Sequence, residues 1–184
     1  MNNAENILLV EDDPGDVHLA LAVLRAMKID NTCVLAADGE MALDYLFQRG
    51  RFAARPVVHP ALVLLDLKLP KVNGFEVLQN IKTNEILREI PVIALTSSRE
   101  DRDIERAYEL GANGYVVKGI DFDEYRESLQ VSVDYWININ ANPNSTGAQK
   151  TSIWLGAFVP RFLLPTDDEL RSHWFGGLAS VSFR

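Results

Sequence analysis

Several acidic side chains of the sequence follow short apolar runs, where folding can bring them together. Glu11, Asp12 and Asp13 come directly after one such run, and Asp66 follows another. Like charges that lie close together raise one another's pKa unless a cation lies among them. Mg²⁺ suits such a place, because it binds one or two carboxylates and keeps waters that a phosphate oxygen can replace. The pattern therefore predicts a magnesium site beside a reactive carboxylate.

Two other polar residues also follow apolar runs. Thr96 brings a hydroxyl that can donate a hydrogen bond, and Lys118 brings a fixed positive charge. A carboxylate nucleophile, a metal, a hydroxyl donor and an ammonium are the groups needed to move a phosphoryl group onto a carboxylate. We therefore expect Asp66 to be the nucleophile, with Thr96 and Lys118 contacting the phosphoryl group.

The apolar runs predict how these residues are positioned. Each run is short, rich in leucine or β-branched residues, and bounded by polar residues, glycine or proline, as in a strand buried on both faces. Segments with helical spacing separate the runs, so we expect an α/β fold with helices on both faces of a parallel sheet. Right-handed crossovers leave few arrangements, and a flavodoxin-like (βα)5 doubly wound sheet of strand order 2-1-3-4-5 is the common one. The five runs are residues 7–10, 32–36, 61–65, 92–95 and 114–117.

Residues that favour helix starts follow the predicted strands. Asp13 can cap the first helix and Asp38 can cap the second. The fifth helix should span about residues 121–138 and bury one apolar stripe. The stripe contains Phe122, Tyr125, Leu129, Val133 and Trp136.

The chain is expected to hold one domain, at residues 5–138. Residues 139–184 should form a linker and a C-terminal tail, because their first part is rich in Asn, Ser, Thr, Gly and Pro. The tail contains aromatic residues such as Trp154 but shows no clear period and no recognisable output domain. Disorder and a docking role for the tail both stay open.

Composition narrows the classes of function. The net charge is −8 and the sequence pI is about 4.9, which argues against binding nucleic acid, since that needs a basic face. Cys33 is the only cysteine, so no internal disulfide can form. No stretch approaches the roughly 20 apolar residues that span a bilayer. We expect a cytoplasmic protein with no membrane partner.

Four segments together resemble the signature blocks of response-regulator receiver domains, the CheY-like proteins of two-component systems. The resemblance implies that Asp66 is the phosphoacceptor and that Asp12 is a direct ligand of Mg²⁺. It further implies that Lys68 gives its backbone carbonyl to the metal and that Glu11 acts from the outer shell through water. The segments are LLVEDD, LVLLDLKLPKVNGFEVL, IPVIALTSS and GANGYVVK.

The same resemblance implies a switch and a weak point. Thr96 and Tyr115 match the family's switch pair, and Lys118 matches the lysine that contacts the phosphoryl group. In the family, proline usually follows this lysine, often after a cis bond, whereas this sequence has Gly119. A cis bond before a residue other than proline costs about 2.5–4 kcal/mol. Either the Lys118–Gly119 bond is trans, or that cost is met locally.

The resemblance also predicts partners. The insertion that starts at Arg49 and the aromatic pair Tyr135-Trp136 are similar to the phytochrome-associated single-domain subgroup. A sensor histidine kinase, in that case a phytochrome, is the expected phosphoryl donor. A homodimer through the fourth helix, fifth strand and fifth helix is a further expectation.

Two other classes of function remain as alternatives. A degenerate receiver would bind partners without phosphorylation, an idea that Gly119 and Lys68 motivate. A true enzyme on the same architecture is the other alternative. A flavin-binding site would be repelled by the acids after the first strand, and an aspartyl phosphatase usually has a second acid where Lys68 stands. We therefore expect a phosphoacceptor and not an enzyme in the ordinary sense.

Overall fold

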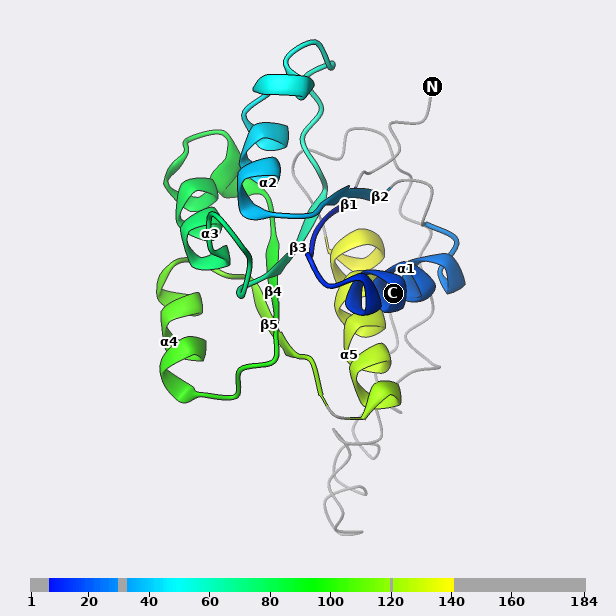
Figure 1. The fold of residues 1–184 in the computed structure, drawn as a ribbon. Coiled ribbons are helices and arrows are strands. Elements are labelled where there is room, and N and C mark those ends of the chain that lie inside the picture. The colour runs from blue at the N-terminus through cyan, green and yellow to red at the C-terminus, as the bar shows by residue number, and fades with distance from the viewer. Residues whose placement is uncertain (1–6, 30–32, 120, 141–184) are drawn as a thin grey trace, which may run out of the picture. The chain divides into compact units, whose positions relative to one another are not determined.

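The computed structural model describes residues 7–29, 33–119 and 121–140 of the 184-residue chain. Five parallel strands form one sheet in the order β2-β1-β3-β4-β5, which confirms the predicted fold class and strand order (Figure 1). The strands are β1 (Ile7–Val10), β2 (Cys33–Ala36), β3 (Leu62–Asp66), β4 (Val92–Thr96) and β5 (Gly114–Val117). The predicted tail from residue 141 onward lies outside the described residues.

Helices lie on both faces of the sheet, with α2, α3 and α4 on one side and α1 and α5 on the other (Figure 1). The π-helical turn η4 (Tyr135–Ile139) continues α5, and the predicted insertion forms the short helix η2 (Gly50–Phe52). The other short helix is η3 (Leu87–Glu89). The long helices are α1 (Pro14–Ala26), α2 (Gly39–Leu46), α3 (Gly74–Thr83), α4 (Asp101–Glu109) and α5 (Phe122–Asp134).

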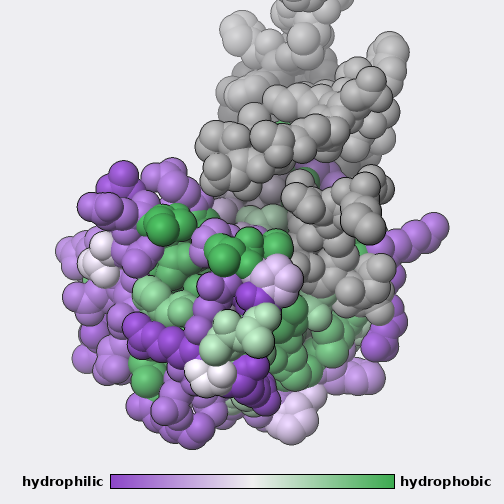
Figure 2. All heavy atoms as spheres, turned by 90° about the horizontal axis from the view of Figure 1, so that it is seen from above, coloured by the Kyte–Doolittle hydropathy of each residue, from purple (hydrophilic) through white to green (hydrophobic). Residues whose placement is uncertain are grey.

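Alternating strand residues build an apolar core on each face of the sheet. Along β1, Leu8 and Val10 pack with the side of α2 and α3, whereas Ile7 and Leu9 pack with the side of α1 and α5. All four side chains are buried. Complete burial of such a side chain stabilises the fold by about 1.5–3 kcal/mol, so these two layers hold the strands rigidly. Seen from above, polar side chains cover the rim of the described domain and apolar ones gather in the middle of that face (Figure 2).

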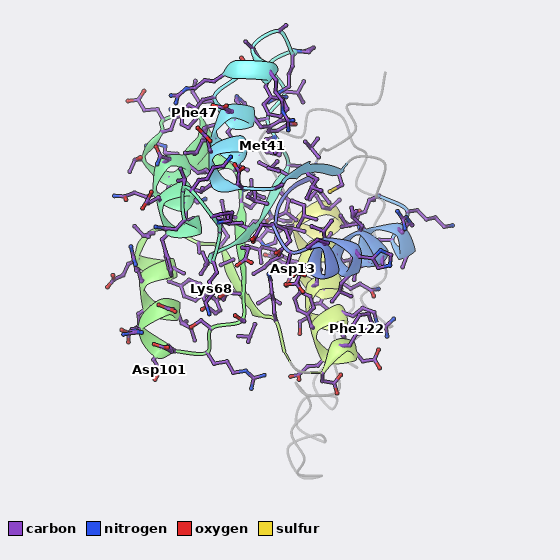
Figure 3. The ribbon with its side chains drawn as sticks, viewed as in Figure 1. Asp13, Met41, Phe47, Lys68, Asp101 and Phe122 are labelled. Carbon is purple, nitrogen blue, oxygen red and sulfur yellow. The ribbon has the colours of Figure 1, made fainter. Side chains whose placement is uncertain are left out.

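Phe122 is a wrong prediction of the core. The stripe of α5 is buried at Tyr125, Leu129 and Val133, but the Phe122 side chain is 57% exposed. Phe122 is the first residue of α5, at the end of the helix where the chain leaves β5 (Figure 3). The helical spacing of apolar residues continues into this first turn, but the sheet does not extend far enough to cover Phe122.

The predicted helix caps are confirmed. Asp13 Oδ1 accepts hydrogen bonds from the backbone N–H groups of Gly15 and Asp16, at 2.8 and 3.0 Å. Asp38 Oδ1 accepts one from Met41 N–H at 2.7 Å. Such caps satisfy backbone donors that a helix start leaves unpaired. They fix α1 and α2 at the end of the sheet where the chemistry-bearing residues lie.

Among the described residues, no helix combines the length and the apolar character that crossing a bilayer requires.

Candidate functional site

The register of the sheet brings the predicted residues to one edge. Val10 pairs with Leu65, so Glu11 follows β1 at the level of Asp66 on β3. The backbone N–H of Glu11 still donates to Ala36 O at 3.0 Å, and that of Lys118 donates to Thr96 O at 2.7 Å. These bonds extend the ladder by one residue past each strand. The backbone that carries the acids and the lysine is therefore as fixed as the sheet.

Lys118 is the centre of the site. Its Nζ lies 2.6 Å from Glu11 Oε2, 2.6 Å from Asp66 Oδ2 and 2.8 Å from Asp16 Oδ2. Only 11% of its side chain is exposed. The described residues contain no cis peptide bond, so the Lys118–Gly119 bond is trans. A glycine with a trans bond still lets Lys118 reach the carboxylates, which settles the alternative left open by the sequence.

Burial sets the protonation of this cluster. Desolvation raises the pKa of Glu11 to about 7, against the hydrogen bond from Lys118 that favours the ionised form. Burial by itself lowers the pKa of Lys118, but its hydrogen bonds to Asp16, Asp66 and Glu11 outweigh this and leave the pKa above its usual value. The lysine is therefore a permanent cation at neutral pH, and the cluster carries more carboxylates than positive charges.

Three carboxylates can hold a divalent cation. Oxygens of Glu11, Asp12 and Asp66 lie within 4.8 Å of one another. Asp12 is exposed while the other two are buried, so an ion can enter from the solvent side. Hard oxygen donors in this number fit Mg²⁺. The residues present therefore fit the predicted metal.

The two oxygens of Asp66 have different partners. Oδ1 accepts a hydrogen bond from the Lys68 backbone N–H at 2.8 Å, while Oδ2 faces Lys118. Behind Asp66 the start of α3 packs closely: a Cβ added to Gly74 would lie 2.1 Å from Asp66 O. The side chain of Asp66 is thus oriented by a backbone donor, while its backbone is held by the closely packed turn.

Ser98 links the two residues predicted as a switch pair. Thr96, fully buried, accepts a hydrogen bond at Oγ1 from the Ser98 N–H at 3.1 Å. Tyr115 is half-buried and donates its hydroxyl to Ser98 O at 3.2 Å. Ser98 also donates its own hydroxyl to Asp103 Oδ2 at 2.6 Å, which ties the loop to the first turn of α4. A movement of Thr96 would therefore shift Ser98, and with it the contacts of Ser98 to Tyr115 and α4.

The Lys68 side chain lies at the mouth of the site and is exposed (Figure 3). Its Nζ donates to Ser97 Oγ at 3.1 Å, which bridges the ends of β3 and β4. The Lys68 ammonium therefore adds a second positive charge at this end of the sheet, while Lys68 contacts Asp66 through its backbone N–H.

Comparison with known proteins identifies the family of the chain. Residues 7–130 match the family described as the response regulator receiver domain. The chain belongs to this family. As a receiver domain, it has the acidic pocket of Glu11, Asp12 and Asp66 at the expected strand ends.

Three relatives show which receivers it is similar to. Response regulator Rcp1 of Synechocystis sp. is 38% identical over 74% of this chain and 91% of its own length. The Mn²⁺-bound crystal structure of Rcp1 covers 76% of this chain and 99% of that one, with a TM-score of 0.70 and 37% identity. The phosphorylated cyanobacterial phytochrome response regulator RcpA covers 76% and 98%, with a TM-score of 0.70 and 34% identity. The bacteriophytochrome response regulator AtBRR is 52% identical over 68% and 90%, with a TM-score of 0.59.

Two residues of the receiver site were missed by sequence reasoning. Asp16 was not predicted as a site residue, yet it contacts Lys118. Ser98 was not predicted either, yet its N–H donates a hydrogen bond to Thr96 Oγ1. An acid one turn into the helix that follows the acidic strand end was the only available signal for Asp16, and it does not reveal the distance to Lys118.

Proposed function

We propose that this receiver domain is a single-domain response regulator that accepts a phosphoryl group on Asp66 from a sensor histidine kinase. The observation that carries the proposal is the contact of Asp66 Oδ2 with Lys118 Nζ at 2.6 Å, beside a carboxylate cluster suited to Mg²⁺. One oxygen of Asp66 thus lies beside a cation that a phosphoryl group can use. The same crevice has a metal position.

In the proposed reaction, Asp66 Oδ2 attacks the phosphorus of a phosphohistidine. A P–O bond forms, the P–N bond breaks, and the histidine nitrogen leaves with the electron pair. The Lys68 N–H holds Oδ1, so the other oxygen points to the donor. Lys118 then moves its ammonium from Asp66 to a phosphoryl oxygen. Because the group stays on the chain, the protein is a phosphoacceptor and not an enzyme in the ordinary sense.

Mg²⁺, when bound, would supply positive charge that offsets the negative phosphoryl oxygens. We assign Asp12 and Asp66 as direct ligands, with the Lys68 carbonyl as a third, and Glu11 as an outer-shell group acting through water. Support comes from the carboxylate cluster and from the Mn²⁺-bound structure of Rcp1.

The proposed signal leaves the site through Ser98. A phosphoryl group would draw Thr96 towards it, and the Ser98 contacts would pass the shift to Tyr115 and α4. We propose that the surface of α4, β5 and α5 changes as a result and serves as the output, with a homodimer through this surface as one form. Residues 5–138 would be the whole receiver, and residues 139–184 its linker and tail.

The partner is proposed from the relatives. RcpA and AtBRR are phytochrome response regulators, so we propose a phytochrome-type histidine kinase as the donor, acting in the cytoplasm. Phosphotransfer profiling tests this: the purified receiver is mixed with phosphorylated candidate kinases, and transfer is followed over time. We expect rapid transfer from a phytochrome kinase to the wild type and none to Asp66→Asn. Equal labelling of Asp66→Asn would exclude Asp66 as the acceptor.

The competing proposal is a receiver that binds partners without phosphorylation. The presence of Gly119 after the lysine supported this proposal. That support is weakened, because Lys118 contacts Asp66 although the Lys118–Gly119 bond is trans. A magnesium titration separates the two functions. A degenerate receiver would show no binding that depends on Asp12 and Asp66.

A further inference from the structure

Asp16 makes a contact that the proposed reaction does not yet use. Its Oδ2 lies 2.8 Å from Lys118 Nζ, and its side chain is 35% exposed. The ammonium has three N–H donors, and three carboxylates surround it: Glu11, Asp66 and Asp16. In the described part of the chain, no other basic side chain contacts Asp16. Among those residues, Lys118 is the basic partner of Asp16.

The three carboxylates that accept hydrogen bonds from Lys118 have different roles in the proposed reaction. Asp66 Oδ2 must release Lys118 when it bonds to phosphorus, and Glu11 belongs to the carboxylate cluster that would hold the metal. Asp16 lies outside that cluster, in the first turn of α1. Its backbone is held by the cap, since its N–H donates to Asp13 Oδ1 at 3.0 Å. Asp16 can thus keep its bond to Lys118 throughout, because neither the phosphoryl group nor the metal competes for it.

The backbone N–H of Lys118 is held by Thr96 O, but this bond does not orient the Lys118 side chain. Next to it, a Cβ added to Gly119 would come no closer than 3.6 Å to any atom beyond its chain neighbours, so the space there is open. On the side of α5, the buried hydroxyl of Tyr125 has no hydrogen-bond partner among the described residues, so it does not hold Lys118. It is uncharged and cannot replace a carboxylate.

We propose that Asp16 is a positioning residue that keeps the Lys118 ammonium in the crevice while Asp66 is phosphorylated. The inference rests on the proposed function of Asp66. Asp16 anchors the lysine from α1, so that one N–H donor stays directed at the phosphoryl oxygens. Asp16 contacts neither the donor nor the metal; its effect passes through Lys118 alone.

The test measures phosphorylation of the full chain by acetyl phosphate with Mg²⁺. Asp16→Ala should lower the rate at low donor concentration by about tenfold, below the effect of removing a charge-stabilising group outright. Asp16→Asn keeps an oxygen acceptor without the charge, so its rate should fall between those of the wild type and Asp16→Ala. Glu124→Ala removes an exposed acid from the first turn of α5 and serves as the matched control, with the rate of the wild type.

Two further readouts separate positioning from general damage. The half-saturating acetyl phosphate concentration should rise in Asp16→Ala more than the maximal rate falls, because Lys118 acts on the oxygens of the bound donor. The Mg²⁺ dissociation constant should stay within about twofold of the wild type, since a factor of this size is a small free energy. Rates in Asp16→Ala equal to or above wild type would overturn the inference, as would a parallel loss of Mg²⁺ binding. If the wild type itself takes no phosphoryl group, the proposed function fails first.

Discussion

Two clusters of one lysine among carboxylates lie in the described part of this molecule, and their lysines differ in burial. Lys118 lies among Glu11, Asp16 and Asp66 with 11% of its side chain exposed. Lys71 lies 2.6 Å from Asp38 Oδ2 and 3.3 Å from Glu40 Oε2, but its side chain is 58% exposed. The ion-pair distances are alike, so distance does not distinguish a structural ion pair from a reactive one.

The pKa values of the carboxylates do distinguish the two clusters. The hydrogen bond from the exposed Lys71 lowers the pKa of Asp38, whose own side chain is only 12% exposed. In the buried cluster desolvation dominates, and the pKa of Glu11 rises to about 7. The carboxylate beside Lys71 is already stabilised by its ion pair, whereas a further cation would stabilise the excess carboxylates of the buried cluster. Burial therefore makes the strand-end cluster able to bind a metal, at a cost to stability.

The largest expected contrast is in phosphorylation. Lys118→Met should slow modification by acetyl phosphate by about 10²–10³-fold, because it removes a preorganised charge at the phosphoryl oxygens. Lys71→Met should leave the rate within about twofold, since its cation lies outside the crevice and a factor of two is a small free energy. Intact-protein mass spectrometry over time measures both. A comparable loss in the two variants would remove the distinction between the clusters.

The next contrast concerns the glycines that pack behind each cluster. A Cβ on Gly74 would lie 2.1 Å from Asp66 O, and one on Gly39 would lie 2.0 Å from Val72 O. Both contacts are with backbone, so Gly74→Ala and Gly39→Ala should each destabilise the fold by about 2–4 kcal/mol. Only Gly74→Ala should also slow phosphorylation. Urea unfolding and the acetyl phosphate assay give the two readings; Gly119→Ala, with its open surroundings, is the control.

Replacing the buried acid Glu11 should stabilise the fold, in contrast to the glycine substitutions. The folded pKa of Glu11, about 7, exceeds its ordinary value of 4.5, so the folded state binds more protons between these values. The contribution of Glu11 to stability therefore falls as pH rises from about 4.5 to 7. At pH 8 without metal, Glu11→Gln should stabilise the protein by about 1–2 kcal/mol and weaken Mg²⁺ binding.

Asp38→Asn is the control for Glu11→Gln, and it should not stabilise the fold at any pH. The folded pKa of Asp38 is lowered, so its contribution is present above the ordinary Asp pKa and is lost as pH falls. Denaturant midpoints measured from pH 5 to 8 without metal distinguish the two. Destabilisation by Glu11→Gln under these conditions would show that burial does not dominate in the crevice.

The smallest expected effect is that of Lys71→Met on stability. The pKa of Lys71 is raised by hydrogen bonds to Asp38 and Glu40, so the ion pair stabilises the fold below the ordinary lysine pKa and is lost above it. Because Lys71 is exposed, solvent screens the pair. We expect a slight drop in the urea midpoint at neutral pH, which added salt should abolish. A drop as large as that of Gly39→Ala would contradict this view of the exposed cluster.

Sequence and structure agree where the local pattern decides the outcome. Short apolar runs bounded by polar residues were enough to predict the strands, and Asp13 and Asp38 cap the helices as expected. Phe122 was predicted wrongly, because helical spacing does not say where the covering sheet ends. Asp16 was missed as a partner of Lys118, since the pairing depends on side-chain reach between α1 and the end of β5. Strand order brings residues to one edge, but only coordinates show which of them touch.

The central claim is that Asp66 is the residue phosphorylated, and its most direct test locates the modification. The protein is incubated with acetyl phosphate and Mg²⁺, the acyl phosphate is reduced with borohydride, which converts a phosphorylated aspartate to homoserine, and peptides are sequenced by tandem mass spectrometry. We expect homoserine at position 66 alone, and none when Mg²⁺ is chelated. Homoserine at Asp12 or Asp13, or its absence in the presence of Mg²⁺, would contradict the account.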